Sequence, residues 1–155
     1  MKIIKLKRKY HESFFKIVQE NNKFYYAKSK ISLLNIKKYY SQYIFKRPTN
    51  ISILIIINEY DQLVGFASFI FLDSLTEFSR FNRRICQLND LFISKKFRNN
   101  NFGKKLLEKI ILISKKNKCN RIEFKVKSKK KSTIEFYQKI GAINDNLQKN
   151  YVLNI

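Results

Sequence analysis

The chain has 155 residues and a formal net charge of +22, because 33 lysine and arginine residues face only 11 aspartate and glutamate residues. A hydrophobic content of 45% with 15% aromatic residues is typical of a globular protein and argues against a disordered chain. One histidine, His11, and two isolated cysteines, Cys86 and Cys119, argue against a metal centre, so we expect no metal.

The same composition bears on the compartment and the partners. No apolar run approaches the ~20 residues of a membrane helix, and residues 1–10 lack the apolar core of a signal peptide. We therefore expect a cytoplasmic protein with reduced thiols and no membrane partner. The positive charge leaves three interpretations open: RNA or ribosome binding, an anionic ligand, or coding bias in a chain rich in Lys, Asn and Ile. The basic runs 115–118 and 127–131 are interpreted mainly as solvated surface.

The first half of the chain alternates predicted strands and helices. Residues 3–6 predict a strand and residues 12–20 a helix. A second helix is predicted over residues 32–45, with Leu33, Ile36, Tyr40 and Tyr43 on one stripe. The apolar runs 51–57 and 63–71, joined by turn residues, predict a hairpin.

The second half contains an interrupted strand. Residues 84–93 are β-prone, but Asn89 and Asp90 break the apolar pattern and predict a bulge. A helix over 102–116 and a strand over 121–126 follow. Ser132 and Glu135 have the spacing of a capping box, Gly141 suits a helix end, and residues 150–155 predict a last strand. This order indicates one α/β domain over residues 1–155 with a mixed sheet.

The loop FRNNNFGKKLL, residues 97–107, has the features of an anion site. A helix start offers unpartnered N–H groups and a positive dipole end, and asparagine tolerates the positive φ that such turns need. Asn99, Asn100 and Asn101 therefore suit a phosphate-binding turn, to which Arg98, Lys104 and Lys105 add charge. The alternative is a plain loop in an asparagine-rich chain.

Two segments together resemble a known family. LNDLFISKKFRNNNFGKKLL, residues 88–107, and IEFYQKIGA, residues 134–142, are similar to the signature segments of the GNAT superfamily of N-acetyltransferases. With GFASFIF, residues 65–71, the closest resemblance is to the spermidine/spermine (diamine) N-acetyltransferase-like group. All 3 glycines, Gly65, Gly103 and Gly141, fall where the family also has glycine.

This resemblance implies a fold, a cosubstrate and residues that bind it. The expected GNAT fold is a central mixed, mostly antiparallel twisted sheet of 6–7 strands with about four helices, splayed between strands 4 and 5. Acetyl-CoA would lie in the splay, and a homodimer is expected. The residues implied to contact acetyl-CoA are Leu91, Phe92, Ile93, Arg98, Asn99, Asn100, Asn101, Phe102, Gly103, Lys104, Lys130, Ser132 and Thr133.

The resemblance also implies catalytic roles. Tyr137 matches the family's general acid, which protonates the departing thiolate, although one tyrosine among 9 could simply pack in a core. Asn89 stands where the polyamine group has a glutamate base, and Asp90 would reach the amine only if a bulge turned it inward. Phe24 and Tyr25 stand where that group binds its substrate, without its acidic residue.

These departures leave three functions open. A small-molecule amine is the first possible substrate. The loss of acidic residues in a chain of net charge +22 argues against spermidine and favours an uncharged or acidic amine, an amino-acid-like amine or an N-terminus as acceptor. The same chemistry on a protein N-terminus, a ribosomal protein or an aminoacyl-tRNA is the second possibility. A degenerate, non-catalytic module that binds CoA or nucleic acid is the third.

Overall fold

The computed structural model describes residues 1–26, 30–46, 49–73, 84–127 and 130–144. These fall into two compact units, Met1–Phe124 and Lys125–Ile155, each of which is described by itself. The single domain over residues 1–155 stays a prediction. No helix in the described ranges combines the length and the apolar character needed to cross a bilayer.

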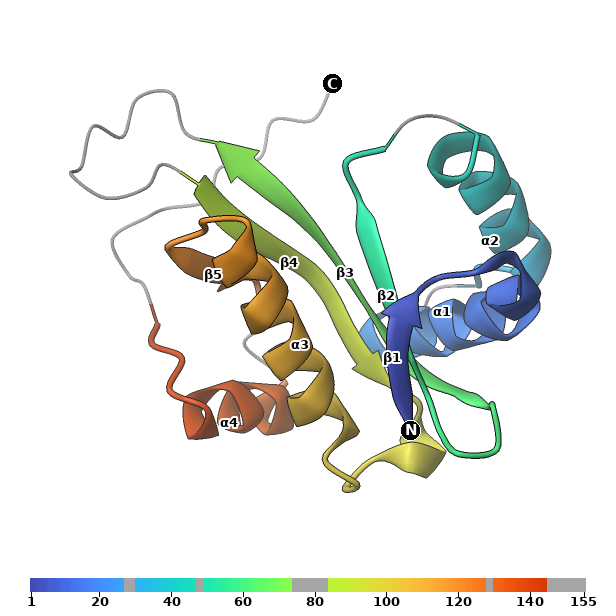
Figure 1. The fold of residues 1–155 in the computed structure, drawn as a ribbon. Coiled ribbons are helices and arrows are strands. Elements are labelled where there is room, and N and C mark those ends of the chain that lie inside the picture. The colour runs from blue at the N-terminus through green and yellow to red at the C-terminus, as the bar shows by residue number, and fades with distance from the viewer. Residues whose placement is uncertain (27–29, 47–48, 74–83, 128–129, 145–155) are drawn as a thin grey trace. The chain divides into compact units, whose positions relative to one another are not determined.

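The first unit is built on a sheet whose strands follow chain order in space (Figure 1). Neighbouring strands are antiparallel from β1 to β4, and β5 lies parallel to β4, so the predicted mixed, mostly antiparallel sheet is confirmed. The described residues form 5 strands rather than 6–7, and the strand predicted at 150–155 lies outside them. The strands are β1 Lys2–Lys5, β2 Ser52–Ile57, β3 Leu63–Asp73, β4 Arg84–Ile93 and β5 Arg121–Phe124.

Helices cover both faces of this sheet (Figure 1). Helices α1, His11–Tyr25, and α2, Leu33–Tyr39, pack on one face, where Phe14 contacts a core that includes Ile55 and Phe66. Helix α3, Phe102–Lys116, packs against β2, β3 and β4 on the other face. The continuous apolar run of β2 is explained by this arrangement, since a strand covered on both faces has no solvent side.

Helix α2 ends in a turn that the 3.6-residue period does not predict. It continues as a π-helical turn, Tyr40–Ile44, closed by the amide of Phe45 donating to the carbonyl of Tyr40 at 2.9 Å. The longer turn displaces the stripe by one residue, so Tyr43 is 48% exposed and Ile44 is half-buried instead. The prediction that Tyr43 belongs to the buried stripe is therefore wrong.

The predicted break in β4 is a β-bulge. Leu88 pairs with Phe69 and Asp90 pairs with Ser68, so Asn89 is an extra residue opposite no partner on β3. A bulge shifts the alternation of side chains by one position. Asp90 consequently lies opposite Ser68 and on the same face of the sheet. In a regular strand, Asn89 would have occupied that position.

A close approach between β3 and β4 explains one glycine. A Cβ on Gly65 would lie 2.5 Å from the carbonyl oxygen of Phe92 and 2.4 Å from the Cδ1 of Ile93. The carbonyl belongs to the paired backbone and cannot move without breaking the ladder. Only glycine fits at this position without displacing β4.

The second unit contains α4, Lys131–Lys139. The capping box predicted from Ser132 is absent, because the helix begins before Ser132 and the carbonyl of Lys130 already accepts from Thr133 and Ile134. Ser132 thus lies inside the first turn, where it cannot act as the cap. The helix end is as predicted: Gly141 has φ +86° one residue after the C-cap and its amide bonds the carbonyl of Gln138.

Candidate functional site

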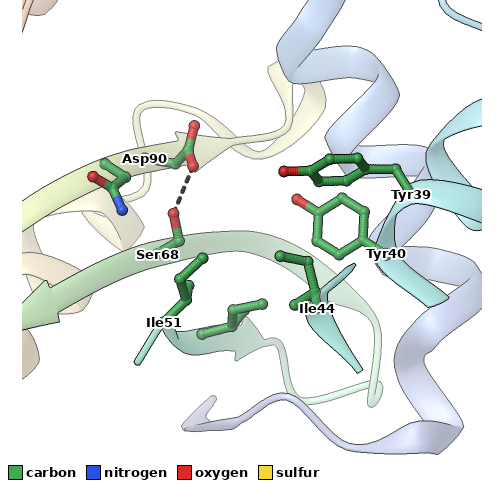
Figure 2. A pocket seen from close by; sticks show the side chains of 8 residues that line it. Tyr39, Tyr40, Ile44, Ile51, Ser68 and Asp90 are labelled. Atoms are coloured by element: carbon green, nitrogen blue, oxygen red, sulfur yellow. Dashed lines mark hydrogen bonds between the residues drawn. The ribbon is translucent and has the colours of Figure 1, made fainter. Parts of the chain in front are cut away.

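A pocket of about 160 Å³ opens on the first unit beside the bulge (Figure 2). Two of its sides are apolar or aromatic and come from the end of α2, the π-helical turn and the start of β2. The remaining side is polar and comes from β3 and β4. The residues that line it are Tyr39, Tyr40, Ile44, Ile51, Ile53, Ser68, Asn89 and Asp90.

Asp90 is held in this pocket by two hydrogen bonds. The hydroxyl of Ser68 donates to Oδ2 of Asp90 at 2.5 Å (Figure 2), and Nδ2 of Asn21 donates to Oδ1 at 3.2 Å. Asn21 is a buried residue of α1, and its own Oδ1 has no hydrogen-bond partner in the described structure. Both donors orient the carboxylate as an acceptor, and both bonds depend on the side-chain direction that the bulge sets.

Two tyrosine hydroxyls face the carboxylate across the pocket. Figure 2 shows the oxygens of Tyr39 and Tyr40 directed toward Asp90, with the rings 5.8 Å apart in an edge-on arrangement. Burial raises the pKa of Tyr40, and the negative charge of Asp90 raises this pKa further. Tyr40 therefore remains a neutral phenol with a proton available for hydrogen bonding.

Beyond the bulge, β4 is no longer paired with β5. The parallel pairing of β4 with β5 extends from Ile85 to Leu88, and past this point the described residues offer β4 a neighbour only on the β3 side. The amide of Ser94 donates to the carbonyl of Val64 on β3. Because the direction of the backbone N–H and C=O groups alternates along an antiparallel strand, those of Phe92 also point toward β3, and those of Leu91 and Ile93 point toward the open edge. The end of this pairing agrees with the expected splay between strands 4 and 5.

Arg98 lies closer to the sheet than its place in the phosphate loop suggests. Its Nε donates to the carbonyl of Ile93 at 3.1 Å, and its guanidinium lies 4.6 Å from the ring centre of Phe24 and 5.3 Å from that of Phe92. Phe24 also contacts Tyr25 edge-on at 5.0 Å. Neither Phe24 nor Tyr25, both predicted to bind substrate, is among the residues that line the pocket.

The loop before α3 has the backbone that an anion site needs. Asn99 has φ +63° and Asn101 has φ +57°, so asparagine does occupy the left-handed positions. Asn101 is the N-cap residue but makes no side-chain cap, and the first turn has no acidic residue. The amides of Phe102, Gly103 and Lys104 therefore remain for an anion, since the first intrahelical bond found there is from Lys105 to Asn101.

Asn100 has a different role in this loop. It is absent from the positive-φ positions, and its Nδ2 donates to the carbonyls of Phe97 at 3.3 Å and Arg98 at 3.0 Å. Those bonds hold the turn in shape from within. The three asparagines are thus not equivalent: two permit the backbone path and one braces it.

The remaining predicted residues lie in the second unit. Tyr137 is 7% exposed on α4 and contacts Phe136 edge-on at 5.1 Å. Lys130, Ser132 and Thr133 surround the first turn of this helix, which has no acidic residue and no side-chain cap. The first turn of α4 is less open than that of α3, because the amide of Thr133 already donates to the carbonyl of Lys130.

Comparison with protein families decides the identity of the fold. The model described as the acetyltransferase (GNAT) family matches residues 10–142, which include the bulge, the loop and α4. The chain belongs to the GNAT acetyltransferase family. No curated protein sequence matches this GNAT chain.

Solved structures share the GNAT architecture at low sequence identity. An integron cassette protein from the mobile metagenome of V. cholerae has a TM-score of 0.85 at 20% identity, covering 99% of this chain and 91% of its own. A ribosomal-protein-alanine N-acetyltransferase from Brucella melitensis biovar Abortus 2308 has a TM-score of 0.75 at 16% identity, with 100% of both chains covered. An aminoglycoside N-acetyltransferase in complex with CoA has a TM-score of 0.70 at 11% identity, covering 99% of this chain and 100% of its own. These likenesses concern the fold.

The sequence alone does not predict that Ser68 and Asn21 bind Asp90. Ser68 stands in an apolar strand and Asn21 on the apolar face of a helix, which marks each as a buried polar group needing a partner. The partner itself is 22 positions from Ser68 and 69 from Asn21. Only the GNAT fold brings the three together.

Proposed function

We propose that this GNAT enzyme transfers the acetyl group of acetyl-CoA to a small primary amine bound in the pocket beside the bulge. The observation that carries the proposal is Asp90, which the bulge turns into the pocket and which Ser68 and Asn21 hold as a hydrogen-bond acceptor. A carboxylate in that setting can hold an ammonium group and take its proton.

The residues present suit acetyl-CoA. The uncapped first turn of α3, flanked by Lys104 and Lys105, offers amides and positive charge to a diphosphate. The open edge of β4 offers the backbone of Leu91, while the carbonyl of Ile93 is engaged by Arg98. Lys130, Ser132 and Thr133 complete the proposed cosubstrate contacts on the strength of the family resemblance.

Bound acetyl-CoA supplies an activated acetyl thioester. Asp90 accepts one proton from the ammonium group of the acceptor, which leaves a neutral amine nitrogen able to attack. The amide of Leu91 donates to the carbonyl oxygen as negative charge develops on it. Tyr137 gives a proton to the departing sulfur, and the second proton of the attacking nitrogen returns to Tyr137 through water, so one proton in total is released.

In this proposal, Asp90 takes the role of the glutamate base of the spermidine/spermine-like group. Asn89 cannot take a proton, and Asp90, the next residue, occupies the position opposite Ser68. The sequence most resembles the spermidine/spermine-like group, but the described pocket contains one carboxylate and the chain carries a net charge of +22. A polycation is therefore a poor acceptor.

The decisive experiment combines binding with turnover. Acetyl-CoA is expected to raise the melting temperature of the protein, and thiol release is expected with a panel of small amines. Stabilisation by acetyl-CoA without thiol release would favour a non-catalytic module. No stabilisation at all would remove the enzymatic proposal.

Size-exclusion chromatography with light scattering tests the homodimer expected from the resemblance.

A macromolecular acceptor is the second candidate. It is supported by the net charge of +22 and by the name of the Brucella neighbour, which acts on a ribosomal protein. In that case the protein would bind RNA or ribosomes with steep salt dependence. Acetylation of ribosomal proteins in preference to every free amine, measured with labelled acetyl-CoA, would establish it.

A further inference from the structure

The size and the charge of the pocket beside the bulge limit which acceptor fits it. It is built from one carboxylate, two phenols and three isoleucines, with Ser68 and Asn89 completing the polar side. Its volume of about 160 Å³ is close to that of an engineered apolar cavity of about 150 Å³ that holds benzene. The pocket is open to solvent on one side, so this volume describes the space for the part of the acceptor that lies next to Asp90.

The charges of the pocket match a single ammonium group. Asp90 is the only carboxylate among the described residues that line it, and both of its oxygens are already oriented by donors. One ammonium balances this carboxylate. A second positive charge would lie against half-buried apolar side chains, where it has no acidic partner and loses part of its hydration.

The two ends of the pocket have opposite character (Figure 2). At the polar end, the hydroxyls of Tyr39 and Tyr40 point toward Asp90, where their oxygens can accept hydrogen bonds from an ammonium group. At the other end, Ile44 and Ile51 are half-buried and face the pocket. An acceptor lying along this axis places its nitrogen at Asp90 and its carbon skeleton on the isoleucines.

We propose that the acceptor is a monoamine with a compact apolar body, branched-aliphatic or benzene-sized, whose ammonium group binds Asp90 and whose body packs on Ile44, Ile51 and Ile53. This inference rests on the proposed function and narrows it to one substrate class. The proposed class of acceptors excludes polyamines and also free amino acids. The carboxylate of an amino acid would approach the negative charge of Asp90 at close range.

The test compares matched amines in the thiol-release assay with acetyl-CoA. Isoamylamine and benzylamine represent the proposed class, putrescine and spermidine carry extra charge, and leucine adds a carboxylate to the isoamylamine skeleton. We expect kcat/KM for isoamylamine to exceed that for putrescine and leucine by about tenfold, because a second charge beside half-buried apolar side chains loses part of its hydration. Spermidine as the best substrate would overturn the inference and leave acetyltransfer intact.

The second part of the test introduces a carboxylate at the apolar end of the pocket. Ile51→Asp adds a carboxylate at the apolar end and is expected to raise the use of putrescine relative to isoamylamine by at least about tenfold, while the isosteric Ile51→Asn does not. The pair Ile44→Asp and Ile44→Asn repeats the comparison on the π-helical turn if a change at Ile51 prevents folding. An unchanged preference in both aspartate variants would overturn the placement of the apolar body.

Binding measured without acetyl-CoA separates this inference from the proposed function. Isoamylamine titrated into labelled protein is expected to shift the resonances of Tyr39 and Tyr40, whereas isoamyl alcohol, which lacks the charge, is not. Binding with no thiol release would support the ligand class and refute the acetyltransferase activity. Equal shifts by the amine and the alcohol would refute the role of the charge.

Discussion

The hydroxyl of Ser68 and the carboxylate of Asp90 lie 2.5 Å apart on adjacent strands, directly opposite each other because Asn89 bulges out of the ladder. This contact joins a local irregularity of the backbone to the chemistry of the pocket. A hydrogen bond to a charged acceptor is stronger than one between neutral groups, so the pair also fixes where the carboxylate points.

We expect Asp90→Asn to lower kcat/KM for the amine by about 10²–10⁴-fold, because the amide can neither take a proton nor balance an ammonium group. The melting temperature should change little, as the amide retains an oxygen for Ser68. The exposed Glu108→Gln serves as the charge-matched control with no effect. Full activity of Asp90→Asn across the pH range would contradict the assignment.

Ser68→Ala tests whether the orientation of Asp90 matters apart from its charge. The energetic coupling between Ser68→Ala and Asp90→Ala, each of which removes the hydrogen bond, in a double-mutant cycle on kcat/KM is expected to be about 0.5–3 kcal/mol. Additive effects would show that the hydrogen bond does not contribute to catalysis. Ser68→Thr, which keeps the hydroxyl, is expected to retain most of the activity that Ser68→Ala loses.

Tyr137→Phe should lower kcat while leaving the stabilisation by acetyl-CoA unchanged. The phenylalanine fills the same buried position on α4 but has no proton for the sulfur, so a loss of about 10²-fold or more is expected. Stopped-flow thiol release gives the rate of this step. Turnover equal to that of the parent protein would remove the acid role from Tyr137 and leave it as a packing residue.

Two neighbouring asparagines are predicted to respond differently to the same change. Asn101→Gly should be tolerated, because glycine adopts φ +57° without strain, whereas Asn101→Val should cost about 1–2 kcal/mol of stability. Asn100→Gly should destabilise the loop, because it removes the bonds to Phe97 and Arg98. Urea unfolding and the KM for acetyl-CoA report both effects. Equal responses at the two positions would contradict their separate roles.

Gly65→Ala should destabilise the protein by about 1–3 kcal/mol, because the new methyl group meets the backbone oxygen of Phe92. The control is the double variant Gly65→Ala with Ile93→Ala. It removes the clash with the Ile93 side chain at 2.4 Å but leaves the clash with the carbonyl oxygen of Phe92 at 2.5 Å. Thermal unfolding should therefore show no full recovery in the double variant. Complete recovery would show that Ile93 alone requires the glycine.

The only histidine should make stability depend on pH. His11 stacks on Phe45 at 4.2 Å, and burial, followed by the charge of Arg8, lowers the pKa of this imidazole from its usual 6.5. As the pH falls through 6.5, the unfolded chain takes up the proton first, so the free energy of unfolding decreases until the lowered folded pKa is reached. The difference between the parent and His11→Phe in urea unfolding from pH 8 to pH 5 isolates this effect. A parallel pH dependence in both proteins would contradict it.

Much of the fold follows from the sequence pattern because alternation and helical period reflect burial directly. The apolar run of β2 and the polar break at Asn89 predicted a covered strand and a bulge, and both are present. The error at Tyr43 has a physical cause, since a π-helical turn changes the period that the prediction assumed. Ser132 was misplaced because a capping box depends on where the helix starts, which the spacing of two residues does not fix.

The candidate site was predicted less completely, because its contacts join distant parts of the chain. Asp90 was identified with the condition that a bulge must turn it, and that condition holds. The donors Ser68 and Asn21, and the pocket wall from the π-helical turn, come from elements far away in the sequence. Local patterns carry no information on which buried polar groups meet.

One extra backbone residue decides which side chain stands opposite Ser68. A slip of one position in β4 would exchange the acid at that place for the amide of Asn89 with no change in composition. Conversely, deleting Asn89 would straighten the strand and still leave Asp90 where it is. The acidity of this cavity therefore depends on the pairing register of β4 as well as on residue type, and comparing related chains column by column would overlook the register.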